Sequence, residues 1–250
     1  MFIGRTDELK QLEEQCALPG FQMTIVYGRR RVGKSTLLAH FVKGKPHVFF
    51  TAEESDETRN LALFSQSVAK GTNTLTGAQF PSFESLFDFL AKTAAVSPLF
   101  VVMDEYPYLA QSHKGFSSLL QLYCDTVFKD TQLKLFLCGS SVSFMENQVL
   151  GYKSPLYGRR TAQMRIYPFS YLESSSFVPG YTHEQQAIVY GLTNGIPQYL
   201  TLFPDKKTIK ESIIRQFLTP SGFLHEEPAF LLREELRDPT QYNAIIEAVA

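Results

Sequence analysis

The stretch TIVYGRRRVGKSTLLAHF, residues 24–41, joins an apolar run to a helical pattern through a short loop that begins and ends with glycine. Residues 28–35 satisfy the pattern G-x-x-x-x-G-K-[ST], in which glycine lets the backbone wrap tightly and turn successive N–H groups inward. The helix that follows points the positive end of its dipole at the same spot. The stretch therefore predicts a loop that cradles phosphate groups between a buried strand and a helix.

Side chains of this loop have separate expected roles. Lys34 adds a positive charge for the β- and γ-phosphates of a nucleotide, and the hydroxyl of Ser35 is a ligand for Mg²⁺. The expected cradle comprises Gly28, Arg29, Arg30, Arg31, Val32, Gly33, Lys34, Ser35 and Thr36. Because the backbone does the holding, we expect the arginine side chains to point away from the phosphates. At least one of them is a candidate to pair with an acidic residue of the helical unit or of a partner.

Apolar runs alternate with helical patterns as far as Pro168, which is typical of an α/β fold with a mostly parallel sheet flanked by helices. We expect strands at 22–28, 47–52, 98–105, 133–140 and, more weakly marked, 162–168. We expect helices at 6–16 (with Thr6 as the N-cap), 34–43, 56–70, 82–95, 115–128 and 141–149. After Pro168 only helical periodicity remains, so a small all-helical second unit is predicted.

Two carboxylates follow the apolar run of residues 99–103, at the carboxyl end of a predicted strand. In an open α/β sheet this end lies beside the phosphate crevice. Asp104 is placed to hold Mg²⁺ through water, and Glu105 to orient and deprotonate an attacking water. Without the loop at 28–35, the same pair could equally well only start a loop. We expect residues 106–108 to be a tight loop exit. Together the two motifs favour hydrolysis of ATP over phosphoryl transfer to a small molecule.

The fourth predicted strand ends in Gly139-Ser140-Ser141. A polar side chain at this place can touch the γ-phosphate and the attacking water, so Ser140 is a candidate sensor. The alternative is that this serine pair only caps the helix that follows, a role that Ser141 fits equally well.

Composition gives no global sign of a nucleic-acid or membrane partner, although Arg29, Arg30, Arg31 and Lys34 form a local basic patch. The 250 residues hold 24 Lys and Arg against 25 Asp and Glu, a formal net charge of −1, so no overall basic field attracts nucleic acid or an anionic membrane. Cys16, Cys124 and Cys138 lack metal-ligand spacing and fit a reduced compartment. No apolar run reaches the length of a membrane span, and the first residues lack the regions of a signal peptide. We expect a cytoplasmic protein.

Five segments, in this order, carry a resemblance to a known group. They are FIGRTDEL (2–9), GRRRVGKS (28–35), VVMDEY (101–106), CGSSVSFMENQVLGYKSPLYGRRT (138–161), and NGIPQYL (194–200) followed by LLREELRDPTQYNAIIEAVA (231–250). The chain resembles the archaeal-type ATPases of the AAA+ superfamily, close to the signal-transduction ATPases with numerous domains. The resemblance implies a P-loop NTPase fold, ATP and Mg²⁺ as cofactors, and ATPase activity.

Further site residues follow from the resemblance alone. Ile3, Gly4 and Arg5 match a motif whose backbone lies near the adenine, although the same letters could be a hydrophobic staple ahead of Thr6. Pro197 matches the GxP motif of a helical lid, where the proline packs near the base; a simple helix break is the alternative.

A basic box is also implied, at residues 155–160. A guanidinium of Arg159 or Arg160 could stabilise charge on the transferring γ-phosphate, in cis or from a neighbouring subunit. The alternative is an exposed basic loop ahead of an edge strand.

The resemblance implies three parts: an ATPase domain over 1–168, a helical lid over 169–225, and a linker with the first helix of a winged-helix domain over 226–250. DNA binding, if present, would then use a winged-helix domain that these residues do not contain. The expected partners are ATP and ADP, with a protein partner or a second copy left open and no membrane. A nucleotide-binding, DNA-associated regulator with negligible turnover is the alternative function, and a small-molecule kinase fits least well.

Overall fold

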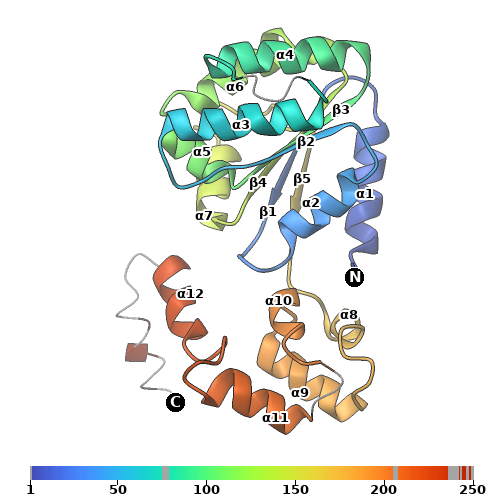
Figure 1. Ribbon diagram of the computed structural model, residues 1–250, viewed down its shortest axis with the longest axis vertical. Helices are drawn as coiled ribbons and strands as arrows, with labels where there is room; N and C mark the ends of the chain where they lie inside the picture. Colours follow the sequence, from blue (N-terminus) through green and yellow to red (C-terminus); the bar gives the residue numbers. More distant parts are fainter. Residues whose placement is uncertain are drawn as a thin grey trace. The chain divides into compact units, whose positions relative to one another are not determined.

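The computed structural model (Figure 1) describes residues 2–74, 79–204 and 208–235, together with Tyr242, Ala244, Ile245 and Ala248. The chain divides into two compact units, Met1–Tyr167 and Pro168–Ala250.

The first unit is built on one five-stranded sheet. Its strands are β1 (Gln22–Tyr27), β2 (His47–Thr51), β3 (Leu99–Asp104), β4 (Leu133–Gly139) and β5 (Ala162–Arg165). They lie in the order β2-β3-β4-β1-β5, and every pairing is parallel. The predicted mostly parallel sheet is thus confirmed. Its fifth strand ends at Arg165, three residues before the expected end.

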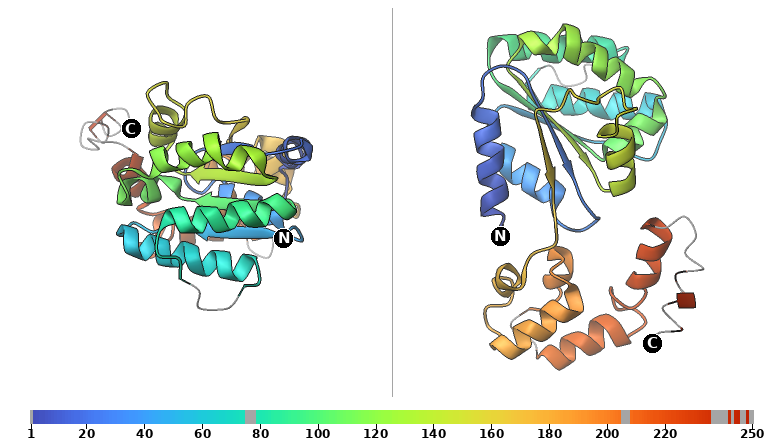
Figure 2. Two further views of the ribbon diagram at one scale, coloured as in Figure 1. Left: turned by 90° about the horizontal axis from the view of Figure 1, so that it is seen from above. Right: turned by 180° about the vertical axis from the view of Figure 1, so that it is seen from behind.

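Helices cover both faces of the sheet, which explains why the central strands read as continuous apolar runs. α1 (Thr6–Ala17) and α2 (Lys34–Val42) pack on one face, through a buried cluster that includes Leu12, Leu38 and Val26. Four helices pack on the other face: α3 (Glu57–Gly71), α4 (Phe83–Val96), α5 (Tyr106–Ser112) and α6 (Phe116–Thr126). The two layers are seen on opposite sides of the strands in Figures 1 and 2.

Two local expectations were wrong, and a third was right in extent but not in helix type. Residues 106–108 are not a loop exit but the first turn of α5, where Pro107 is tolerated because its missing N–H has no partner there anyway. Thr6 is not an N-cap, since Arg5 occupies that position with a left-handed backbone (φ 63°) and no capping side-chain bond. The helix expected at 141–149 is the short α7 (Val142–Phe144), which continues as a π-helical turn over Met145–Val149.

The second unit contains only helices within its described residues, as predicted. They are α8 (Tyr171–Ser175), α9 (His183–Thr193), α10 (Pro197–Leu200), α11 (Ile209–Ile213), a π-helical turn over Ile214–Leu218, and α12 (Glu227–Glu235). α8, α9 and α11 each begin with a capping box, in which the N-cap hydroxyl accepts the backbone N–H three residues on, and the side chain of that residue accepts the N-cap N–H. Of the winged-helix segment expected from 226, the part after Glu235 lies almost wholly outside the described residues.

None of the described helices has the length and apolar character that crossing a membrane requires. All three cysteines are free thiols.

Candidate functional site

The loop at residues 28–33 connects β1 to α2 at the carboxyl edge of the sheet. A Cβ on Gly28 would lie 2.3 Å from the carbonyl oxygen of Ile166, so only glycine fits this close backbone approach. Arg31 and Gly33 both have left-handed backbones, with φ of 68° and 90°. Alternation of this kind turns successive N–H groups toward one concavity, which suits an anion.

Lys34 starts α2 and lies folded over this loop. Its Nζ donates to the carbonyl oxygen of Arg29 at 2.9 Å, and only 5% of the residue is exposed. Burial lowers the pKa of Lys34, while the nearby Cys138, Glu105 and Asp104 act in the opposite direction. The ammonium is therefore held on the loop, and it is near enough to the two carboxylates that the sequence singled out for their charges to favour its protonated form.

Asp104 is buried at the end of β3, and its Oδ1 accepts the N–H of Glu105 at 3.1 Å. Glu105 has a left-handed backbone (φ 51°), which is uncommon for a residue with a side chain and is often found at functional sites. Its Oε2 accepts the hydroxyl of Ser140 at 2.8 Å and the Ser140 N–H at 3.3 Å. The structure thus brings the candidate base and the candidate sensor into direct contact.

The donor set fits Mg²⁺. The hydroxyl of Ser35, next to Lys34, and the carboxylate of Asp104 are hard oxygen ligands of the kind Mg²⁺ prefers. Among the described residues, no His, Cys, Asp and Glu side chains form a group of three or more that could cage a metal. Such a site suits an ion that keeps its waters and takes phosphate oxygens as further ligands. Thr36, the last cradle residue, is exposed on α2.

One arginine of the loop has a partner that the sequence did not suggest. Nη2 of Arg30 donates to the hydroxyl of Tyr108 at 3.0 Å. Tyr108 lies on α5, one turn after Glu105, which is the N-cap of that helix. This bond therefore ties the loop at residues 28–33 (the phosphate loop) to the helix that follows the candidate base. The sequence did not predict this contact, because residues 106–108 were expected to form a loop and not the first turn of α5.

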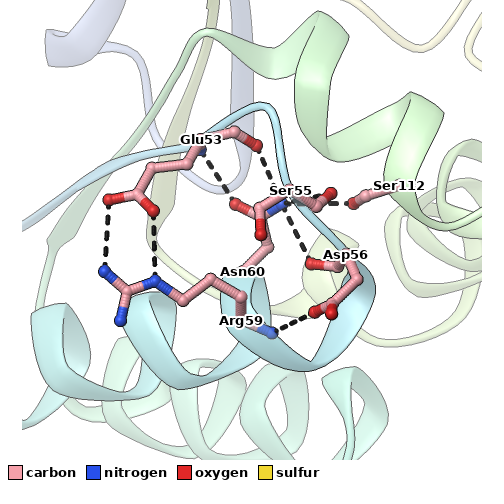
Figure 3. A network of polar contacts seen from close by, with 6 residues as sticks. All are labelled: Glu53, Ser55, Asp56, Arg59, Asn60 and Ser112. Atoms are coloured by element: carbon pink, nitrogen blue, oxygen red, sulfur yellow. Dashed lines mark hydrogen bonds and ion pairs between the residues drawn. The ribbon is translucent and has the colours of Figure 1, made fainter.

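The loop after β2 borders the same edge and is held by a buried amide (Figure 3). Oδ1 of Asn60 accepts the Glu53 N–H, and Nδ2 of Asn60 donates to the carbonyl oxygen of Glu53, both at 3.0 Å. Nδ2 also lies 3.4 Å from the hydroxyl of Ser112, at the end of α5. α5 is therefore anchored at its start to Ser140, in its middle to the phosphate loop, and at its end to α3.

Residues 2–5 lie against the phosphate loop. The ring of Phe2 stacks on His40 of α2, with centroids 3.9 Å apart. Ile3 is half-buried and Gly4 is exposed, while the Arg5 side chain is buried and donates to the carbonyl oxygen of Val32. The motif therefore adjoins the cradle, and its placement near an adenine stays a prediction.

Arg159 is not brought to the phosphate loop of its own chain. It binds Asp125 of α6 in a bidentate pair, with Nε–Oδ1 at 2.9 Å and Nη2–Oδ2 at 2.8 Å. Asp125 lies where α6 leads back toward the start of β4, and the Thr161 N–H donates to the carbonyl oxygen of Met23 near the start of β1. Both mark the amino edge of the parallel sheet, opposite the loop.

Arg165 lies at the other end of β1, whereas Arg160 directly precedes Thr161 near the amino edge. Burial raises the pKa of Tyr27, the last residue of β1, and the charges of Arg165 and Arg160 oppose that rise. Arg165 is in register with Tyr27 and pairs with Glu146 at 3.0 Å. Arg165 was not expected, because only the strand pairing reveals that it ends β5 beside the loop.

Pro197 lies in the second unit, as the first residue of α10. Gly195 before it has φ 69°, and a Cβ there would lie 2.0 Å from the carbonyl oxygen of Phe169. The N–H of Phe169 in turn donates to the carbonyl oxygen of Gly195 at 2.9 Å. The GxP segment is thus built against the first residues of its own unit, and contact of Pro197 with a base remains a prediction.

Comparisons with known proteins bear on the family and the fold. A family model described as an ATPase domain predominantly from Archaea matches residues 2–203. An uncharacterized protein of Methanocaldococcus jannaschii is 34% identical over 250 residues, which are 100% of this chain and 54% of that protein. The chain therefore spans about half the length of this curated relative.

Solved structures share the fold at low sequence identity. A Walker-type ATPase of Pyrococcus abyssi has a TM-score of 0.69 at 22% identity, covering 93% of this chain and 76% of that one. The ORC2 protein of Aeropyrum pernix, solved as ADPNP–ADP complexes, has a TM-score of 0.58 at 14% identity, covering 94% and 71%. A signal-transduction ATPase with numerous domains from Pyrococcus horikoshii reaches 0.50 at 17% identity, covering 95% and 33%.

Proposed function

The chain belongs to the family of ATPase domains found predominantly in Archaea, and we propose that it is a Mg²⁺-dependent ATP hydrolase that works as a nucleotide-driven conformational switch. The observation that carries the proposal is the contact between Glu105 and Ser140 at the strand ends beside the phosphate loop. A carboxylate held by a neighbouring hydroxyl, close to a buried lysine, is arranged for activating water rather than for binding alone.

The roles of the residues follow from their positions. The N–H groups of residues 28–33 and the ammonium of Lys34 bind the phosphates, and Ser35 and Asp104 would hold Mg²⁺. When bound, this ion supplies positive charge that offsets the charge developing on the phosphoryl oxygens. Glu105 orients the attacking water and accepts its proton, and Ser140 holds the Glu105 carboxylate in place. Arg160 is the better candidate for an arginine finger, because Arg159 is committed to Asp125.

We expect the nucleotide to switch the protein because ATP and ADP contact its two conformations to different extents. A ligand shifts a conformational equilibrium only by the difference between its affinities for the two states. We propose that the second unit acts as the lid, that ATP favours one arrangement, and that loss of the γ-phosphate removes this preference. The proposal keeps the division into an ATPase part, a lid and the start of a winged-helix part.

Hydrolysis is tested by phosphate release from ATP with Mg²⁺ and after chelation of the ion. We expect steady release that stops on chelation and returns when Mg²⁺ is restored. ADP must accumulate in equal amount without an added acceptor, which separates a hydrolase from a small-molecule kinase. Turnover that is indifferent to Mg²⁺ would contradict the proposal.

A DNA-associated regulator with negligible turnover is the second candidate. It is favoured by the fold shared with the ORC2 protein of Aeropyrum pernix and with a Drosophila ORC structure solved bound to DNA. Binding of the full-length protein to duplex DNA across a range of salt concentrations tests it, since contacts to phosphates must weaken as salt rises. Phosphate release together with the absence of any salt-dependent binding would exclude this candidate.

A further inference from the structure

Arg5 bridges two segments that are far apart in sequence. Nη2 of Arg5 donates to the carbonyl oxygen of Val32 at 2.8 Å and to that of Tyr167 at 2.7 Å. Nη1 of Arg5 pairs with Glu8 at 2.7 Å, and only 5% of the residue is exposed. Charged donors that are shielded from water form strong and geometrically demanding bonds, so this bridge fixes the spacing between the two carbonyl groups.

The two bridged carbonyls have distinct functional positions. Val32 belongs to the phosphate loop, next to Gly33. Tyr167 is the last residue of the first unit, and the chain enters the second unit at Pro168.

A second contact joins the same two segments at the other end of the loop. Gly28, the first loop residue, packs so closely on Ile166 that a Cβ would meet its carbonyl oxygen at 2.3 Å. The Ile166 N–H donates to the carbonyl oxygen of Tyr27 at 2.7 Å. The peptide 166–167 is therefore braced against both ends of the phosphate loop, at Gly28 directly and at Val32 through Arg5.

We propose that Arg5 is a positioning residue that couples occupancy of the phosphate loop to the peptide leading into the second unit. Phosphate binding fixes the loop backbone, including the Val32 carbonyl, and Arg5 passes this constraint to the Tyr167 carbonyl. The inference rests on the proposed function, because it assigns one route by which the nucleotide state leaves the site.

The test is hydrogen exchange of backbone amides with and without saturating ADPNP, in the parent and in Arg5→Met. In the parent, we expect ADPNP to slow exchange both in the loop peptide and in a peptide covering residues 164–170. In Arg5→Met the loop should still be protected, with nucleotide affinity about tenfold lower because one charge-assisted bond to the loop is lost. The response of residues 164–170 should disappear.

Two further variants guard against a trivial loss of fold. Arg5→Gln is shorter and uncharged and cannot reach both carbonyl groups, so it should also lose the response of 164–170. Glu8→Gln removes one ion pair and leaves both carbonyl bonds, so it should behave as the parent. Thermal unfolding of each variant checks that it is folded.

The outcomes separate the two claims. If folded Arg5 variants keep the parental response at 164–170, or if the parent protects its loop but not this peptide, the coupling is wrong and the proposed function stands. If ADPNP does not protect the loop of the parent, the proposed function itself fails.

Discussion

At the scale of single residues, Gly28 has no substitute. Its close approach is to the backbone of Ile166, which cannot rotate away as a side chain could. We expect Gly28→Ala to lower the free energy of unfolding by about 2 kcal/mol and to abolish nucleotide binding. Gly191→Ala is the matched control, because Gly191 lies within α9 with open space around its Cβ position and should gain about 0.5 kcal/mol. Urea unfolding measures both, and a parental value for Gly28→Ala would refute the close contact.

We expect Lys34 to serve nucleotide binding but to lower the stability of the fold, whereas Gly28 supports both. Burial lowers its pKa, so the folded chain releases this proton at a lower pH than the unfolded chain does. Between the two pKa values the unfolded state binds more protons, and the free energy of unfolding therefore rises with pH.

We expect Lys34→Met to flatten that alkaline rise and to increase the free energy of unfolding by about 1 kcal/mol at pH 7 without nucleotide. The same variant should lose binding of a fluorescent ATP analogue. Urea unfolding at a series of alkaline pH values checks the first part. A variant less stable than the parent would mean that the Lys34 bond to Arg29 outweighs the cost of burying the charge.

Residues joined by a linear motif could be predicted from the sequence, and residues joined by packing could not. The loop at 28–35 and the pair Asp104-Glu105 are motifs, and the structure places both at one edge of the sheet. The bonds of Arg30 to Tyr108 and of Arg159 to Asp125 span 78 and 34 residues. No local pattern marks such partners, because they depend on which helix lies beside which strand.

At the scale of elements, Asn60 decides how the loop between β2 and α3 is held. The side chain is fully buried and satisfies both backbone groups of Glu53 (Figure 3). We expect Asn60→Ala to lower the free energy of unfolding by about 3 kcal/mol, since it leaves buried polar groups without partners.

Arg59→Ala is the control in the same network. Its ion pair with Glu53 is exposed to water, where such pairs contribute little, so chemical unfolding should not detect its loss. Equal losses for the two variants would show that the loop is not held by Asn60.

Element types followed from periodicity wherever the apolar runs were long. β1, β3 and β4 are buried along their whole length and were predicted nearly to the residue. α5 was not, because it is a helix of 7 residues that starts at an unusual backbone conformation of Glu105 and contains a proline in its first turn. Short helices are specified by the residues on which they pack, such as the buried contacts of Tyr106 and Leu109.

At the scale of the whole molecule, the two units have separate cores. Phe169, Val189, Tyr199 and Phe203 belong to the core of the second unit, and the clusters around the sheet belong to the first. In the proposed switch, the peptide at 167–168 is the covalent route by which a change in one unit reaches the other. This division is what a switch requires, and it makes the state of the bound nucleotide the quantity to follow.

The most direct measurement is a single-turnover experiment with protein in excess over ATP, comparing the parent with Glu105→Gln. The parent should convert its bound ATP to ADP and phosphate. Glu105→Gln should bind ATP with parental affinity and keep it intact, with a rate lower by a factor of about 100 or more, because only the base is removed. If Glu105→Gln hydrolyses bound ATP at the parental rate, Glu105 is not the base and the account of this site is wrong.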